Sequence, residues 1–249
     1  MAGPVNRRPA PLKRRPPPFS DEEIQARVLH RDGLILVIDK PAGIAVHAGP
    51  SGAPNLEECF DALRYGLPRP PALAHRLDAD TSGVLVLGRH PKALSKLGRI
   101  FQSRETQKTY WAVVEGVPPA EEGVFDGPLL KVNTRSGWSV KVSDKGQTAL
   151  TRYKVLGRGQ SSSGMGMTWL ELSPETGRTH QIRVHCAHAG CPVIADRLYG
   201  HAAPGQQLHL HSRAIVLPLS KNKPPLRVEA PPPAHMLDAL NACGFSPAT

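Results

Sequence analysis

The chain has 249 residues, enough for one sizeable domain or two small ones with a buried core. Its formal net charge of +10 favours a polyanionic partner, with nucleic acid ahead of an anionic membrane. No apolar run approaches the length of a membrane span, no apolar segment of a secretory signal precedes the body, and four scattered cysteines suit a reducing cytosol. Membrane-spanning and secreted classes are therefore excluded, and a cytoplasmic protein is expected.

Residues 1–19 are predicted to be a disordered tail rich in proline and arginine, too poor in apolar side chains to order itself. The tail carries five of the basic residues and no acid up to residue 18. It is either a flexible leader or a basic arm that adds phosphate contacts to an RNA complex. The folded domain is expected over residues 20–249.

The first elements follow from caps and apolar runs. Ser20 and Glu23 form a capping-box pattern that predicts a short helix toward His30. Residues 34–38 are a short apolar run typical of a buried strand, stopped by proline and glycine at 41 and 43. A helix is predicted from the Asn55 cap to Tyr65.

The next elements alternate between strands and one clear helix. A strand at 84–88 precedes a predicted helix from Pro91 to Gln102. Residues 106–115 are rich in β-forming side chains, and their alternation places Tyr110 and Val114 on one face and Trp111 on the other. Further strands are predicted at 139–143, 149–156 and 167–172, with a hairpin turn at 144–146.

The last third of the chain is predicted to hold a helix entered from residue 176 and ending near Ala189, followed by Gly190. A strand at 208–217 and a terminal helix at 235–242 complete the pattern. Strands dominate, the intervals between them are short, and no repeat of fixed period occurs. The pattern predicts an α+β fold built on a largely antiparallel sheet with flanking helices.

Three kinds of site are weakly supported by the residues. Histidines and cysteines crowd the chain between 180 and 211, but neither Cys-x2-Cys nor His-Glu-x-x-His occurs. A helix would also point His185 and Cys186 about 100° apart. The phosphate-loop pattern Gly-x4-Gly-Lys-Ser/Thr is absent. A serine nucleophile has no Gly-x-Ser-x-Gly elbow, so Ser82 reads as a turn hydroxyl.

Carboxylate chemistry on a nucleic acid is the fourth possibility. It requires an ionised acid, a cation to hold it, an aromatic face for a base, and basic residues for phosphates. Asp78, Arg183 and Tyr110 supply the first three, since a guanidinium keeps a nearby carboxylate charged. The phosphate contacts are assigned to Lys40, Arg76 and Arg178. Each residue also has a plainer interpretation, as a turn brace, a core side chain or a surface charge.

Five segments, in order, resemble the RluA-type RNA pseudouridine synthases. Residues 75–83 (HRLDADTSG) resemble their signature motif and residues 39–43 (DKPAG) their early element. Residues 108–116 resemble the tyrosine strand, residues 177–185 (GRTHQIRVH) the late motif, and residues 194–200 the segment that follows it. The resemblance extends from about residue 33 to 217.

The resemblance implies a reaction and a set of roles. Uridine within RNA is isomerised to pseudouridine in a central RNA-binding cleft, with no cofactor and no metal, by a protein expected to be monomeric. Asp78 matches the catalytic aspartate, Tyr110 the tyrosine against the target base, and Arg183 the arginine paired with that aspartate. The substrate, ribosomal RNA or tRNA, is expected to contact His75, Arg76, Lys40, Lys108, Arg178 and Ile182.

The chain departs from many members of this family in one respect, and two other functions remain as alternatives. Only 38 residues precede Asp39, and 18 of them belong to the tail rich in proline and arginine. This is too few for the S4 RNA-binding module of many relatives, so the catalytic body and the tail are expected to select the RNA. One alternative is an RNA-binding protein that keeps the fold without turnover. The other is a zinc-dependent hydrolase or deaminase.

Overall fold

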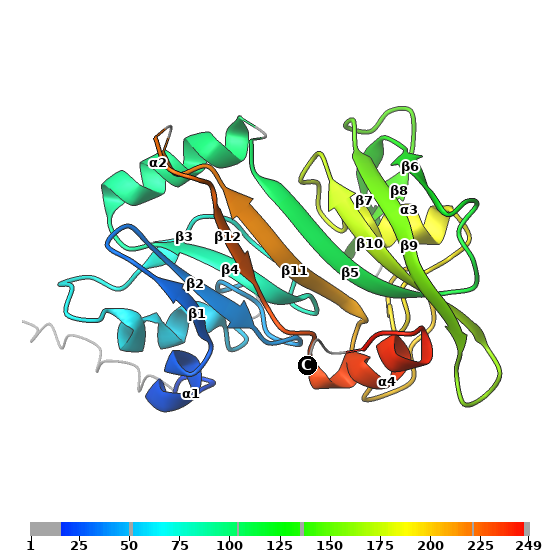
Figure 1. The fold of residues 1–249 in the computed structure, drawn as a ribbon, viewed down its shortest axis with the longest axis horizontal. Coiled ribbons are helices and arrows are strands. Elements are labelled where there is room, and N and C mark those ends of the chain that lie inside the picture. Colours follow the sequence, from blue (N-terminus) through cyan, green and yellow to red (C-terminus); the bar gives the residue numbers. More distant parts are fainter. Residues whose placement is uncertain (1–15, 50–51, 104, 135–136, 221, 247–249) are drawn as a thin grey trace, which may run out of the picture.

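The computed structural model describes residues 16–49, 52–103, 105–134, 137–220 and 222–246 (Figure 1). Most of the tail predicted over 1–19 therefore lies outside the described residues. Within the described ranges, no helix is long and apolar enough to cross a membrane.

The fold is organised around one ten-stranded sheet in the order β1-β2-β4-β11-β5-β10-β9-β6, with β3 paired to β4 and β12 to β11. Its strands are β1 (Val28–Arg31), β2 (Ile35–Lys40), β3 (Ala72–Leu73), β4 (Ser82–Gly88), β5 (Gln107–Glu115), β6 (Glu122–Asp126), β9 (Leu150–Gln160), β10 (Gly166–Pro174), β11 (Leu210–Leu217) and β12 (Leu226–Glu229). Among these described strands β4 and β11 run parallel and the other neighbours antiparallel. The predicted α+β fold with a largely antiparallel sheet is confirmed.

Helices cover both faces of the sheet. They are α1 (Asp21–Gln25), the 3-10 helix η1 (Leu56–Leu63), α2 (Pro91–Gln102), α3 (Gln181–His188) and α4 (Ala234–Ala242). On one face α1 and η1 pack over β2 and β4, and α3 packs over β5 and β10. On the other face α2 and α4 cover the corresponding halves (Figure 1).

Strand β5 joins the two halves of the sheet. As its alternation predicted, Ala112 and Val114 enter the cluster beneath α3, whereas Val113 enters the cluster beneath α4. Tyr110 packs against the α3 cluster and also against the α1–η1 cluster. Tyr110 therefore lies at the boundary between two hydrophobic clusters on one face of the sheet.

Local signals located the helices but not all of their bounds. The helix predicted from Pro91 to Gln102 forms over those residues, and the capping box at Ser20 is present. The first helix ends at Gln25 rather than near His30, because residues 28–31 join the sheet as β1.

Two other predicted helix boundaries were wrong. The helix after Asn55 is a 3-10 helix that ends at Leu63, and the Asn55 amide donates to Glu58 instead of capping it. The late helix begins at Gln181 rather than 176, because the residue before it, His180, has a left-handed backbone with φ of 53°.

A second, two-stranded sheet lies beside α3. It consists of β7 (Leu129–Thr134) and β8 (Gly137–Val142). The turn predicted at 144–146 does form, but it does not join two paired strands. It leads the chain back to Leu129, with which Gln147 makes an isolated bridge. The hairpin prediction was wrong on that point, since β9 pairs with β6 and β10.

Candidate active site

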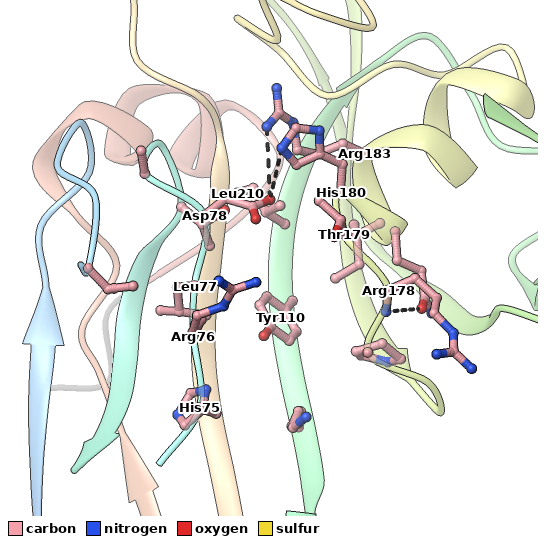
Figure 2. Close-up of a pocket in the computed structure, with 18 of the residues that line it drawn as sticks. His75, Arg76, Leu77, Asp78, Tyr110, Arg178, Thr179, His180, Arg183 and Leu210 are labelled. Carbon is pink, nitrogen blue, oxygen red and sulfur yellow. Dashed lines mark hydrogen bonds and ion pairs between the residues drawn. The ribbon is translucent and has the colours of Figure 1, made fainter. Parts of the chain in front are cut away.

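A cleft of about 510 Å³ opens over the boundary between the two clusters. Asp78, Tyr110 and Arg183 all line it, from the loop before β4, from β5 and from α3 respectively (Figure 2). The sheet therefore brings together three side chains that are widely separated in sequence.

Tyr110 lines the cleft from strand β5. Burial raises the pKa of its phenol to about 12, and the nearby Asp78 charge acts in the same direction, while a hydrogen bond with the Ser212 side chain partly offsets both. Tyr110 is therefore a neutral phenol at physiological pH. Its ring offers an aromatic surface next to the carboxylate of Asp78.

The Asp78 loop is held by side chains on both sides. The Nε2 atom of His75 accepts a hydrogen bond from the Val86 amide at 3.0 Å, which ties the start of the loop to β4. The Thr81 amide donates to the Asp78 carbonyl at 3.2 Å, so residues 78–81 form a turn. The turn-forming residues of this segment thus fix where the Asp78 carboxylate lies.

Lys40 holds the same loop from beneath. Its ammonium is fully buried and donates to the carbonyls of Pro41, Ala79 and Thr81 at 2.8, 2.8 and 2.9 Å. Burial lowers the pKa of Lys40 to about 7, although the charges of three nearby aspartates oppose this shift. The three carbonyl acceptors match the three N–H donors of an ammonium. The sequence predicted that Lys40 binds substrate, whereas the structure places its three donors on carbonyls inside the protein.

The end of the loop is fixed against β11. The Ser82 hydroxyl hydrogen-bonds with Nδ1 of His211 at 2.8 Å, and both residues are buried. Gly83 has φ of 103°, and a Cβ there would collide with the carbonyl oxygen of Ser212. A glycine is therefore required where β4 and β11 meet in parallel.

Arg183 is anchored by a carboxylate that is not Asp78. Its Nε and Nη2 atoms each donate to Asp196 at 2.7 Å, and both side chains are buried. Burial raises the pKa of Asp196, but the hydrogen bonds and charge of Arg183 outweigh it and hold the pKa below its usual range. The Nη1 atom of Arg183 is left 3.9 Å from Asp78, so the predicted Arg183–Asp78 pair is a loose contact that leaves the carboxylate available.

A second group faces Asp78 from the same wall. The Nε2 atom of His180 lies 3.9 Å from the Asp78 carboxylate (Figure 2). Its Nδ1 atom lies 2.8 Å from the Tyr199 hydroxyl. That hydroxyl accepts the Val140 amide at 3.0 Å, so its own proton is directed to Nδ1. Burial lowers the pKa of His180 in spite of Asp78, which leaves a neutral ring with its Nε2–H toward the carboxylate.

Comparison with known proteins agrees with this geometry. A family model described as RNA pseudouridylate synthase matches residues 34–188, a span that includes Asp78, Tyr110 and Arg183. The chain belongs to the RNA pseudouridylate synthase family. The synthase therefore isomerises uridine to pseudouridine within RNA, as the family's members do.

Named relatives cover most of the chain. It is 40% identical over 218 residues to an uncharacterized RNA pseudouridine synthase of Zymomonas mobilis, a match that spans 85% of this chain and 96% of the relative. It is 35% identical to a ribosomal large subunit pseudouridine synthase C of Haemophilus ducreyi, over 88% of this chain and 69% of the relative. The structure of human RNA pseudouridylate synthase domain containing 4 superposes with a TM-score of 0.72 at 27% identity, covering 89% of this chain and 94% of that one.

The other residues predicted to contact substrate differ in how far they are exposed at the cleft. Arg76 is exposed at the mouth of the synthase cleft, with Nη1 3.4 Å from His47. Lys108 lies at the cleft with its ammonium 5.2 Å from the ring centroid of Phe101, and burial lowers its pKa. Ile182 is buried and forms part of the apolar wall.

His75 and Arg178 line the cleft without presenting a free charge to Asp78. Burial and the Lys108 charge lower the pKa of His75 to about 3, so its ring is neutral. Arg178 donates through Nε to the Thr148 carbonyl at 3.2 Å, and Figure 2 shows its guanidinium on the far side of the chain from Asp78. Arg178 is therefore placed at the rim of the cleft.

Several residues of the synthase site carry no signal of their role in the sequence. Asp196 lies in the segment 194–200 that resembles the family, but nothing in its spacing indicates that it binds Arg183. Trp138 lies on β8, and Tyr199 lies in a turn after α3. Both reach His180 only through the fold, since 42 and 19 positions separate them along the chain.

The candidate metal ligands of the synthase are engaged in other contacts. His185 lies within hydrogen-bonding distance of Thr151 and the Gly127 carbonyl, and His211 of Ser82 and the Ala230 carbonyl. Within the part of the chain that the structure describes, no group of three or more His, Cys, Asp or Glu side chains is placed to hold a metal ion.

Proposed function

We propose that Asp78 is the catalytic carboxylate of the synthase, that Arg183 positions it, and that Tyr110 packs against the target uracil. One observation carries this proposal. Among the described residues that line the cleft, Asp78 is the single carboxylate, and its side chain is 31% exposed. A group that must touch substrate has to be both accessible and held, and Asp78 meets both conditions.

The reaction explains why this environment suits a carboxylate. The N1–C1′ bond of uridine breaks, the uracil turns, and C5 bonds to C1′; N1 then carries a proton and C5 loses one. A carboxylate can assist by attacking the sugar carbon, by removing a sugar proton or by adding to the ring. Arg183 and the Nε2–H of His180 lie 3.9 Å from Asp78, near enough to stabilise its charge without occupying it.

The walls of the cleft support the same proposal. The uridine must leave its stack to reach Asp78, which costs a few kcal/mol. Stacking on an aromatic ring such as Tyr110 returns about 1–3 kcal/mol per base. Leu77, Ile182 and Leu210 line the cleft with apolar surface, and exclusion of water favours recombination of the freed uracil over its hydrolysis.

We further infer that the substrate is a structured ribosomal RNA or transfer RNA in the cytosol. The net charge of +10 suits a large polyanion, and one relative is named for the large ribosomal subunit. All four cysteines are free and buried, which agrees with a reducing compartment. Pseudouridine maps of a deletion strain and its parent would identify the RNA.

The assigned role of Asp78 is tested by Asp78→Asn, with Asp80→Asn as the matched control. Both changes remove one charge from the same loop, but Asp80 does not line the cleft. Asp78→Asn is expected to bind RNA as tightly as the parent and to form no pseudouridine in a carbodiimide or mass-spectrometric assay. Asp80→Asn is expected to retain turnover, with thermal unfolding recorded for both variants. Normal product from Asp78→Asn would refute the assignment.

A further inference from the structure

Trp138 is an exposed aromatic side chain at the wall of the cleft. It lies on β8 of the β7–β8 hairpin, which rests against α3 through a small cluster that includes Val140 and Val184 (Figure 1). Trp138 remains 40% exposed, and it lines the same cleft as Asp78 and Tyr110. The other two tryptophans pack against each other and against Phe245 on the far face of β5.

The ring of Trp138 is already held in place. It stacks on the His180 ring with the centroids 5.0 Å apart and the planes inclined by 26°. His180 in turn faces Asp78 at 3.9 Å. A planar group on the exposed surface of Trp138 would thus extend a stack that begins next to the catalytic carboxylate.

A cation accompanies this aromatic surface. The ammonium of Lys131, from the neighbouring strand β7, lies 4.1 Å from the centre of the Trp138 ring. Lys131 is exposed and carried on a flexible stem, so its ammonium can move from the ring to a phosphate when a base arrives. An aromatic face beside a lysine is the combination that binds single-stranded RNA, one for the base and the other for the backbone.

We propose that Trp138 and Lys131 form a subsite for an unpaired nucleotide adjoining the target uridine, with the base stacked on Trp138 and its phosphate paired with Lys131. The subsite rests on the proposed placement of the target uridine beside Asp78. It would let the synthase bind the nucleotide next to that uridine whatever its base. Recognition of this kind needs the neighbouring base to be unstacked, so it favours uridines in loops over those inside long helices.

The test uses two RNA probes of equal charge: a uridine decamer and a decamer of abasic ribose phosphates. Binding to the full-length protein is measured at low salt by anisotropy of labelled probes, which does not depend on the tryptophan that the variants remove. Trp138→Leu is expected to weaken binding of the uridine decamer by about 5-fold to 100-fold and to leave the abasic probe unchanged. Trp138→Phe, which keeps an aromatic face, is expected to retain most of the affinity.

The phosphate contact has its own matched pair of variants. Lys131→Met is expected to weaken both probes and to reduce the slope of log affinity against log salt by about 0.7. Lys141→Met removes the same charge from the same hairpin, but Lys141 pairs with Leu130 and points to the opposite face, so the slope should not change.

Three results would overturn the subsite: no binding of the uridine decamer by the parent protein, unchanged binding by Trp138→Leu, or equal losses on both probes. Equal losses would show that Trp138 only supports His180. Because these readouts are binding and not product, they are independent of the Asp78 assignment. Pseudouridine formed by Asp78→Asn would refute that assignment while leaving the decamer result intact.

Discussion

Replacement of Asp196 by asparagine is predicted to lower both the stability and the turnover of the synthase. The Asp196 carboxylate is fully buried and takes two hydrogen bonds of 2.7 Å from Arg183. Removing one charge of a buried pair leaves the other uncompensated, which costs about 3–5 kcal/mol. Asparagine keeps an oxygen for the amides of Leu198 and Tyr199, so this cost is assigned to Arg183.

The functional loss has a separate cause. Without Asp196, the nearest carboxylate to Arg183 is Asp78, whose oxygen lies 3.9 Å from Nη1. The guanidinium is expected to close on Asp78 and to hold it away from the substrate, so kcat falls while RNA affinity is kept. Urea unfolding and thermal melting measure the first effect, with an expected fall in Tm of roughly 6–20 °C. Steady-state pseudouridine formation measures the second.

A control and a double variant sharpen this test. Glu121→Gln removes one partner of the exposed pair with Arg158 and is expected to leave stability nearly unchanged, because water screens both groups. The double variant Arg183→Met with Asp196→Leu replaces the buried pair by apolar groups and is expected to recover most of the stability without recovering turnover. An Asp196→Asn protein as stable as the parent would refute the buried-charge argument.

Three further predictions concern residues that hold the Asp78 loop and the strands beside it. Gly83→Ala is expected to lower the free energy of unfolding by about 2–5 kcal/mol in urea titrations, because its Cβ meets the Ser212 carbonyl at a positive φ. Lys40→Met removes the donor to three carbonyls, two of them in the Asp78 loop, and is expected to reduce kcat by about 100-fold with little change in RNA affinity. Burial lowers the pKa of His211 to about 4 in the folded protein, whereas the unfolded chain keeps a value near 6.5. Between these two values the unfolded state binds a proton that the folded state does not, so the free energy of unfolding falls as the pH falls from 6.5 toward 4. His211 alone accounts for a loss of about 2 kcal/mol from pH 8 to pH 5, and His211→Gln should abolish that part of the difference.

Much of the fold could be predicted because its signals are local. The apolar stripe and terminators of residues 91–102 specify α2, and the alternation of residues 107–115 specifies which side chains of β5 enter each cluster. Short strands such as β1, β3 and β12 were missed, because four or fewer residues carry too little periodicity to identify.

For the candidate site, the motifs located Asp78, Tyr110 and Arg183, and the fold places all three at one cleft. The partner of Arg183 could not be predicted. Both Asp78 and Asp196 are acids within plausible reach, and only the packing of the segment after α3 places Asp196 in bidentate contact.

The sequence by itself determined the longer helices and strands, the family resemblance and the residue types of the site. The tertiary structure decided what each charged side chain does. In the sequence Lys40 looks like an ordinary lysine at the end of a strand. In the structure its ammonium binds the carbonyl of the next residue, Pro41, and those of Ala79 and Thr81, which are 39 and 41 positions further along the chain. Trp138 became part of the cleft only because its hairpin folds onto α3. Burial and long-range partners set the charge and reach of a side chain, and neither is encoded in the local pattern around it.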